Sequence, residues 1–181
     1  MERFLAHLDG LSGGAEPRFL PVTSTKPGLP RVMVMHYAGL PEPDMSTAVT
    51  YGLSLADHPE WHAGRPELTI TVASEDDHWG LAVGFLAEQL RGDCPFSYGD
   101  TINFGEQIAP ESQMTAFAVF APATLAPEDY TGIDVGDRLP ISIAGCYPIF
   151  DVEREYIHQH GLRAFWELEW DPYNVRRPPA V

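Results

Sequence analysis

The sequence predicts a single α+β domain, in which a mixed, largely antiparallel β-sheet packs against helices. Three observations support this prediction. Strand-like apolar runs recur along most of the chain, amphipathic helical patterns interrupt them, and no linker, repeat or low-complexity tract divides the 181 residues. With 44% hydrophobic residues, a chain of this length can bury one substantial core.

Residues 1–30 are expected to form a short amphipathic helix and then an irregular lead-in, because glycines and prolines punctuate this segment. Runs of strand-forming residues follow it. The expected strands lie within residues 31–38, 47–54, 67–73, 96–104, 114–120 and 139–149. In the third of these, apolar and polar residues alternate, which predicts one buried face and one face in water.

The clearest helix pattern runs from Trp79 to Leu90, where apolar residues recur at spacings of three and four. Ser74 and Asp77 before it fit a capping box, and the acidic residues there complement the helix dipole better than they suggest a metal site. A short helix is expected after Asp151, with a second helical stretch behind it. Aromatic residues on periodic apolar faces are expected to lie in the core: Trp79, Phe85, Phe117, Phe120, Phe165 and Trp166.

These elements divide the chain into an N-terminal lead-in (1–30), one domain (31–170) and a proline-rich tail (171–181) that is expected to be extended or loose. Cys94 and Cys146 lie far apart in the sequence and are expected to be reduced, buried thiols. The N-terminus does not resemble a secretory signal, and no apolar run approaches the ~20 residues that span a bilayer. We therefore expect a cytoplasmic protein.

The charge balance is strongly acidic. Eleven Lys and Arg residues stand against 26 Asp and Glu residues, which gives a formal net charge of -15. Such a surface repels nucleic acids and anionic membranes, so neither is an expected partner. It would attract a basic protein, although solubility alone also explains an acidic surface.

No catalytic signature is present: the sequence has no glycine-rich dinucleotide or phosphate-binding loop and no H-E-x-x-H motif. His58 and His62 have the spacing of two metal ligands on a helix, but Pro59 and Gly64 argue against a helix there. We therefore expect neither a metal nor a cofactor, and no enzymatic activity. An alternative is a small-molecule-binding protein or hydrolase that uses Asp57, His58 and His62.

Trp61 differs from the other large aromatic residues because it lies in a loop between two strands, among charged and polar residues. An aromatic side chain in such a setting is a common centre of a protein interface. The alternative is that Trp61 folds back as a lid over the edge of the sheet. The sequence leaves both interpretations open.

Four segments, taken in order, resemble the suppressor of fused family. They cover most of residues 30–170 and consist of Thr50-Tyr51-Gly52-Leu53-Ser54; Pro66-Glu67-Leu68-Thr69; the helix from Trp79 to Leu90 with Tyr98-Gly99-Asp100-Thr101-Ile102; and Ile141-Ser142-Ile143 with Tyr147-Pro148-Ile149-Phe150 and Glu153-Arg154-Glu155-Tyr156. No single segment is specific to the family, and the resemblance rests on the order in which the four segments occur.

The resemblance implies a compact α+β domain that binds other proteins and has no known catalytic activity. Animal relatives grip an extended segment of a Gli transcription factor, which adds as a strand, whereas bacterial relatives are regarded as immunity proteins against polymorphic toxins. This sequence lacks the additional carboxy-terminal domain of the animal proteins and has a shorter loop between Ser54 and Glu67, which favours the bacterial function. The expected partner is a basic toxin domain or a similar protein. The residues expected to contact it are Asp57, His58, Glu60, Trp61, Tyr98 and Asp100.

Overall fold

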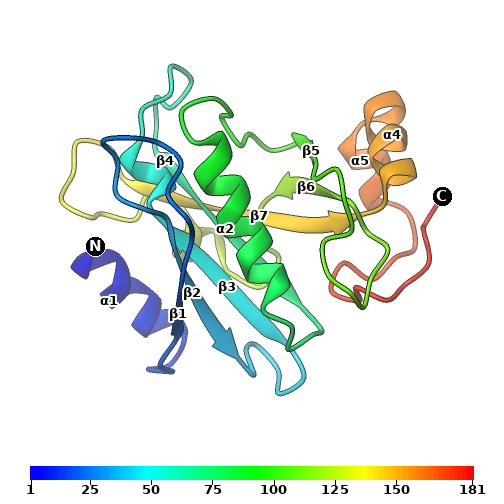
Figure 1. Cartoon of the computed structure of the whole chain (residues 1–181), viewed down its shortest axis with the longest axis horizontal. Helices are drawn as coiled ribbons and strands as arrows, with labels where there is room; N and C mark the ends of the chain where they lie inside the picture. Colours follow the sequence, from blue (N-terminus) through cyan, green and yellow to red (C-terminus); the bar gives the residue numbers. More distant parts are fainter.

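One seven-stranded mixed sheet runs through the protein, as seen in a computed structural model that describes residues 1–181 (Figure 1). Its strand order is β1-β2-β3-β4-β7-β6-β5, and all neighbours are antiparallel except β4 and β7, which are parallel. The strands are β1 (Arg18–Pro21), β2 (Met33–Ala38), β3 (Ser46–Tyr51), β4 (Arg65–Val72), β5 (Thr101–Asn103), β6 (Ala116–Phe120) and β7 (Ile141–Ile149). The α+β prediction is confirmed.

Helices cover both faces of this sheet (Figure 1). The longest, α2, lies across one face and encloses the main core with β2, β3, β4, β6 and β7. On the other face, α1 covers one end of the sheet, while α4 and α5 cover β6 at the other end. The helices are α1 (Glu2–Leu11), α2 (His78–Leu90), α3 (Pro127–Tyr130), α4 (Asp151–His160) and α5 (Leu162–Trp166), with a 3₁₀ turn η1 (Leu53–Leu55). None of them is long and apolar enough to cross a bilayer.

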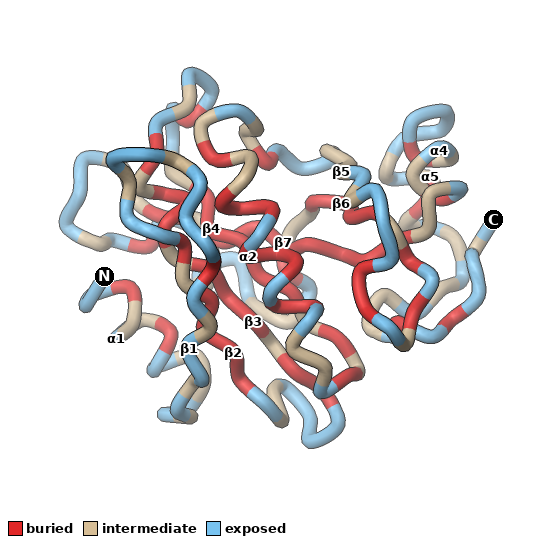
Figure 2. The backbone as a smooth tube through the Cα atoms, in the orientation of Figure 1, coloured by how far each residue is buried: buried red, intermediate tan, exposed pale blue.

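The predicted strands agree with the structure to within a few residues, apart from two differences. The lead-in contains the edge strand β1, which pairs with β2. In β4 both faces are buried, because α1 and the segment before β7 cover the face that was expected to meet water. Its polar residues Glu67 and Thr69 are therefore inside the protein, and Figure 2 shows how evenly burial extends along the central strands.

A buried carboxylate explains why two of the family-like segments occur together. Glu67 at the start of β4 is fully buried and accepts hydrogen bonds from the end of β3. Its Oε1 accepts the backbone N–H groups of Gly52 (2.8 Å) and Ser54 (3.0 Å), and its Oε2 accepts the Thr50 hydroxyl (2.7 Å). The Thr50 hydroxyl in turn accepts the N–H of Leu68 (2.8 Å). Side chains thus continue the contact of β3 with β4 where the backbone pairing between them stops.

A second buried carboxylate fixes the irregular lead-in against α2. Glu88 accepts the backbone N–H groups of Thr25 (2.8 Å) and Val32 (3.2 Å) and pairs with the Arg91 guanidinium (2.8 Å), and neither charged side chain is exposed. Arg91 also donates to the carbonyl of Pro30 (2.6 Å). Both terminal nitrogens of the guanidinium and both carboxylate oxygens therefore have partners, which offsets much of the cost of burying the pair, and only the Arg91 Nε lacks one.

The proline-rich tail is extended but not loose. The Arg177 guanidinium is buried, pairs with the fully buried carboxylate of Glu153 in α4 (2.9 Å), and lies over the ring of Trp170, 4.6 Å from its centroid. Glu153 also accepts the N–H of Ala180 (2.8 Å). The tail is therefore fastened to α4 by a charge pair and a cation–π contact, which composition alone did not indicate.

Candidate protein-binding surface

The outer side of α2 is apolar, which is unusual for a helix on the surface of a domain. Its inner side packs on the sheet through Trp79, Val83 and Leu86, as the spacing predicted. On its outer side, however, Leu81 is 38% exposed and Phe85 is 46% exposed, one turn apart. The prediction that Phe85 lies in the core was therefore wrong.

A hollow of about 500 Å³ lies beside these two side chains, between α2 and the segment 104–110. Phe104 forms part of its wall and meets Phe85 edge to face, with ring centroids 5.8 Å apart. Phe104 in turn packs on the buried ring of Phe117 in β6. The exposed apolar surface is therefore continuous with the core and supported by it.

The open edge of the sheet adjoins this hollow, because β5 immediately precedes Phe104. β5 is the terminal strand and pairs only with β6. The N–H of Phe104 bonds to Thr115, and the register pairs Ile102 with Phe117, so alternation directs the backbone groups of Thr101 and Asn103 outward. Together, Leu81, Phe85, Phe104 and the outer edge of β5 form what we call the α2–β5 surface.

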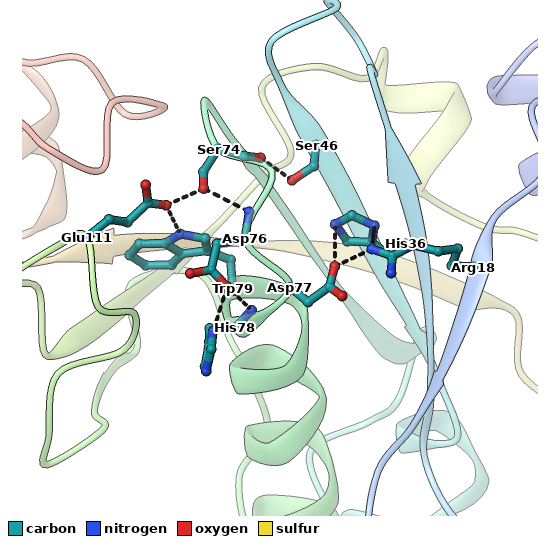
Figure 3. Close-up of polar contacts among 9 residues, drawn as sticks. All are labelled: Arg18, His36, Ser46, Ser74, Asp76, Asp77, His78, Trp79 and Glu111. Atoms are coloured by element: carbon teal, nitrogen blue, oxygen red, sulfur yellow. Dashed lines mark hydrogen bonds and ion pairs between the residues drawn. The ribbon is translucent and has the colours of Figure 1, made fainter.

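Glu111 holds the loop that forms the far wall of the hollow (Figure 3). Its carboxylate accepts the indole N–H of Trp79 at the start of α2 (3.1 Å) and the hydroxyl of Ser74. The guanidinium of Arg176, in the tail, pairs with the same carboxylate. Within the loop, the Gln107 amide donates to the carbonyl of Ser112 (2.5 Å). The wall is thus tied to α2 and to the tail.

The acidic residues before α2 cap the helix, although not as a capping box. The Asp76 carboxylate accepts the N–H of His78 (3.0 Å) and contacts its ring, and the Ser74 hydroxyl accepts the N–H of Asp76 (3.0 Å). Asp77 is the N-cap residue but makes no capping bond. Its carboxylate instead pairs with Arg18 of β1 (Figure 3).

The buried ring of His36 completes this contact between β1 and α2 (Figure 3). A guanidinium can only donate hydrogen bonds, so the Arg18 side chain donates to the His36 Nδ1, 3.3 Å away. The His36 Nε2 lies 3.7 Å from the Asp77 carboxylate. Burial lowers the pKa of His36, Asp77 opposes this shift and Arg18 adds to it. A neutral imidazole fits this site.

Trp61 is folded back into the protein, as in the second of its two sequence-based interpretations. It is only 9% exposed, belongs to the main core and donates its indole N–H to the carbonyl of Pro95 (3.0 Å). The ring of His58 packs against it, with centroids 5.6 Å apart. Trp61 therefore attaches the 56–64 loop to the segment before β5 and is not an exposed contact residue.

The polar residues of this loop do not converge on one point. Asp57 is exposed and pairs with Arg65 (3.0 Å), whereas the His58 Nδ1 accepts the N–H of Glu60 (3.2 Å). Glu60 and His62 are exposed, and no hydrogen bond or ion pair joins His62 to Asp57 or His58. The chain contains no group of three or more His, Cys, Asp or Glu residues arranged to hold a metal ion.

Tyr98 and Asp100 lie directly before β5, and the contact of Tyr98 with Phe120, which packs on Trp166 of α5, puts Tyr98 on the side of the sheet opposite α2. Tyr98 is 50% exposed and packs on Phe120, with centroids 5.4 Å apart. The half-buried Asp100 accepts the N–H of Ser97 (2.8 Å), which shapes the turn into the strand. Because Trp61 contacts Pro95, the structure brings the predicted loop and these two residues to the same end of the sheet.

Sequence reasoning missed the residues at the centre of this surface. A signal was present, however: on the outer face of α2 the residues His78, Leu81, Phe85 and Gln89 include no acid and no lysine or arginine. In a chain with 26 acidic residues, an uncharged outer helix face is itself informative.

Comparisons with known proteins agree with this architecture. The family model for suppressor of fused protein (SUFU) matches residues 28–178, which is most of the chain. No curated protein sequence matches the chain significantly. The segments that carried the resemblance all lie within the matched range.

Solved structures of similar fold include three suppressor of fused proteins. A homolog from Neisseria gonorrhoeae superposes with a TM-score of 0.77 at 19% identity, over 99% of this chain and 96% of that chain. The Sufu–Fu complex gives 0.72 at 14% identity, over 99% and 91%. Drosophila Suppressor of Fused gives 0.70 at 14% identity, over 98% of this chain and 50% of that one. At these identities the likeness establishes the fold, and the family model establishes the membership: the chain belongs to the suppressor of fused family.

Proposed function

We propose that this chain is a non-enzymatic protein-binding domain whose partner docks on the α2–β5 surface. The observation that carries the proposal is the pair of exposed apolar side chains on α2, Leu81 and Phe85, beside a hollow and an open strand edge. An exposed apolar cluster that is continuous with the core is typical of a docking site. A family relative has been solved in a complex with Fu, which supports protein binding as the class of function.

The partner is expected to combine apolar and basic side chains. Leu81, Phe85 and Phe104 would bury the apolar ones, while exposed Glu106 at the hollow and the net charge of -15 favour a basic chain. Tyr98 and Asp100 would contribute next to the edge strand β5, and Asp57, His58 and Glu60 at the periphery of the surface. Trp61 would act indirectly, by holding the loop in place.

A matched pair of variants tests the location of the surface. Phe85 and Phe19 are both 46% exposed, but Phe19 lies in β1 at the opposite edge of the sheet. Phe85→Ser should weaken binding to a captured partner by about 2 kcal/mol or more, as expected for a central aromatic residue, and mainly by faster dissociation. Phe19→Ser should leave binding unchanged. Equal effects of the two variants, or an effect of Phe19→Ser alone, would place the interface elsewhere.

We further propose that the partner is a polymorphic toxin domain and that the chain is its immunity protein, or that it regulates a similar intracellular partner. The acidic charge supports this idea, because exposed charges accelerate association with a basic toxin and are screened beyond about 8 Å at physiological ionic strength. Co-expression should therefore restore growth of cells that produce the captured toxin domain. Phe85→Ser should abolish this protection and Phe19→Ser should not. A captured partner that is harmless to cells would refute the immunity role but not the docking surface.

A further inference from the structure

A separate pocket of about 270 Å³ opens on the face of the sheet opposite α2. Its floor is formed by buried side chains of four adjacent strands: Tyr37 of β2, Val49 of β3, Thr69 of β4 and Ile143 of β7. One wall is the last turn of α1, with half-buried Leu11 at the mouth. The pocket shares no lining residue with the hollow beside Phe85.

The lining of this pocket is uncharged, although charged residues make up 20% of the sequence. The polar side chains among its twelve lining residues are all serine, threonine or tyrosine, and the rest are apolar. An ion that entered would lose its hydration and meet no opposite charge among the lining residues. The pocket therefore suits a neutral and mainly apolar molecule.

One buried hydroxyl at the pocket has no hydrogen-bond partner. The hydroxyls of Thr47 and Thr69 already donate to the carbonyls of Leu40 and Ala48 (3.0 Å each), whereas the Tyr37 hydroxyl is buried and forms no hydrogen bond. Buried polar groups are normally paired, so an unpaired one calls for a ligand or a bound water. Burial, and then the charge of Asp9, raises the pKa of Tyr37 to about 12. The phenol is thus protonated at neutral pH and available as a donor.

The size of the pocket limits the ligand, and the burial of the Tyr37 hydroxyl limits access to it. At about 30 Å³ per water, the pocket has room for roughly nine water-sized groups. The Tyr37 hydroxyl is shielded from solvent, and residues of α1 line the same pocket, so a ligand would need a small displacement of the helix end to reach the hydroxyl. Gly13 and Gly14 follow α1 with φ of 65° and 83°, and two glycines at this point would permit such a displacement.

We propose that this pocket binds a small, neutral, largely apolar molecule that carries one acceptor oxygen, which the Tyr37 hydroxyl recognises. Two probes of equal ring size test the proposal. Cyclohexanone has the acceptor and methylcyclohexane lacks it. Each would be titrated into protein with labelled methyl groups, and the signals of Leu8 and Ile143 would report on the pocket while that of Leu81 reports on the α2–β5 surface.

Cyclohexanone should shift the Leu8 and Ile143 signals and leave Leu81 unchanged. Tyr37→Phe should weaken cyclohexanone binding about three- to tenfold, the effect of one hydrogen bond, and change methylcyclohexane binding less than twofold. Leu11→Trp, a change at the half-buried mouth that the fold should tolerate, should block both probes. The proposal is overturned if neither probe shifts the pocket signals, if Leu11→Trp does not reduce the shifts, or if Tyr37→Phe affects both probes equally. The pocket would then hold water only.

Discussion

Replacing Glu67 should free the turn after β3 from β4, and it tests directly whether the buried carboxylate stabilises the fold. In Glu67→Ala, the buried N–H groups of Gly52 and Ser54 lose their acceptor. Each unsatisfied buried donor costs about 1–3 kcal/mol, whereas the hydroxyls of Thr50 and Ser54 can rotate toward other acceptors. The expected loss in the free energy of unfolding is therefore about 2–6 kcal/mol, a large part of the stability of an ordinary domain.

Glu67→Gln should cost less, about 1–2 kcal/mol, because the amide oxygen still accepts the two N–H groups but without the charge. The exposed Glu60 provides the control, since Glu60→Ala should change stability by less than about 0.5 kcal/mol. Urea unfolding of the three variants ranks their losses of stability. Amide hydrogen exchange at Gly52 and Ser54 shows whether the loss in the Glu67 variants arises at this turn. If Glu67→Ala unfolds at the same urea concentration as the wild type, or if both amides stay as protected as before, the buried carboxylate does not hold this turn.

Two further predictions concern stability. Trp61→Ala should lower the free energy of unfolding by about 3–5 kcal/mol, as much as Trp79→Ala, because both rings are buried and both indole N–H groups are hydrogen-bonded. A loss below about 1 kcal/mol in urea unfolding would show that Trp61 is not a core residue. His36 has a pKa below its ordinary value of 6.5, so the native state binds fewer protons than the unfolded chain and stability should fall as the pH drops below about 6.5. His36→Asn should remove this part of the pH dependence. If the free energy of unfolding changes by the same amount between pH 7.5 and pH 5.5 in the wild type and in His36→Asn, the prediction is wrong.

Local patterns predicted most elements because the sheet is built from runs with clear period-two or both-faces-apolar character. Strands β2 to β7 and helix α2 needed only such local information, whereas β1 was not predicted. The parallel pairing of β4 with β7 and the pairing of β1 with β2 depend on contacts between distant segments, which periodicity does not encode. The same limit explains why the second face of β4 was assigned to water: the alternation was read correctly, but the cover supplied by α1 was not foreseen.

For the candidate surface, helical periodicity identified the inner face of α2 but not the exposed apolar residues on its outer side. Phe85 was assigned to the core because its side chain is apolar, and apolar character alone does not distinguish a residue that faces the sheet from one that faces a partner. The loop around Trp61 was chosen for its charged neighbours, yet its indole reaches Pro95 and is buried. Tyr98 and Asp100 lie next to the edge strand β5, because the motif that suggested them directly precedes that strand, and their contact with a partner stays a prediction.

Three buried glutamates have a structural role that a count of acidic residues does not reveal. Glu67, Glu88 and Glu153 are among 26 acidic residues, and nothing in their sequence context separates them from solvated ones. Each accepts backbone N–H groups from a segment without regular structure: the turn after β3, the lead-in before β2 and the proline-rich tail. A carboxylate is suited to this task because two oxygens can accept several donors at once. A few carboxylates therefore organise irregular segments inside the protein, and the remaining acidic residues give the chain its net charge of -15.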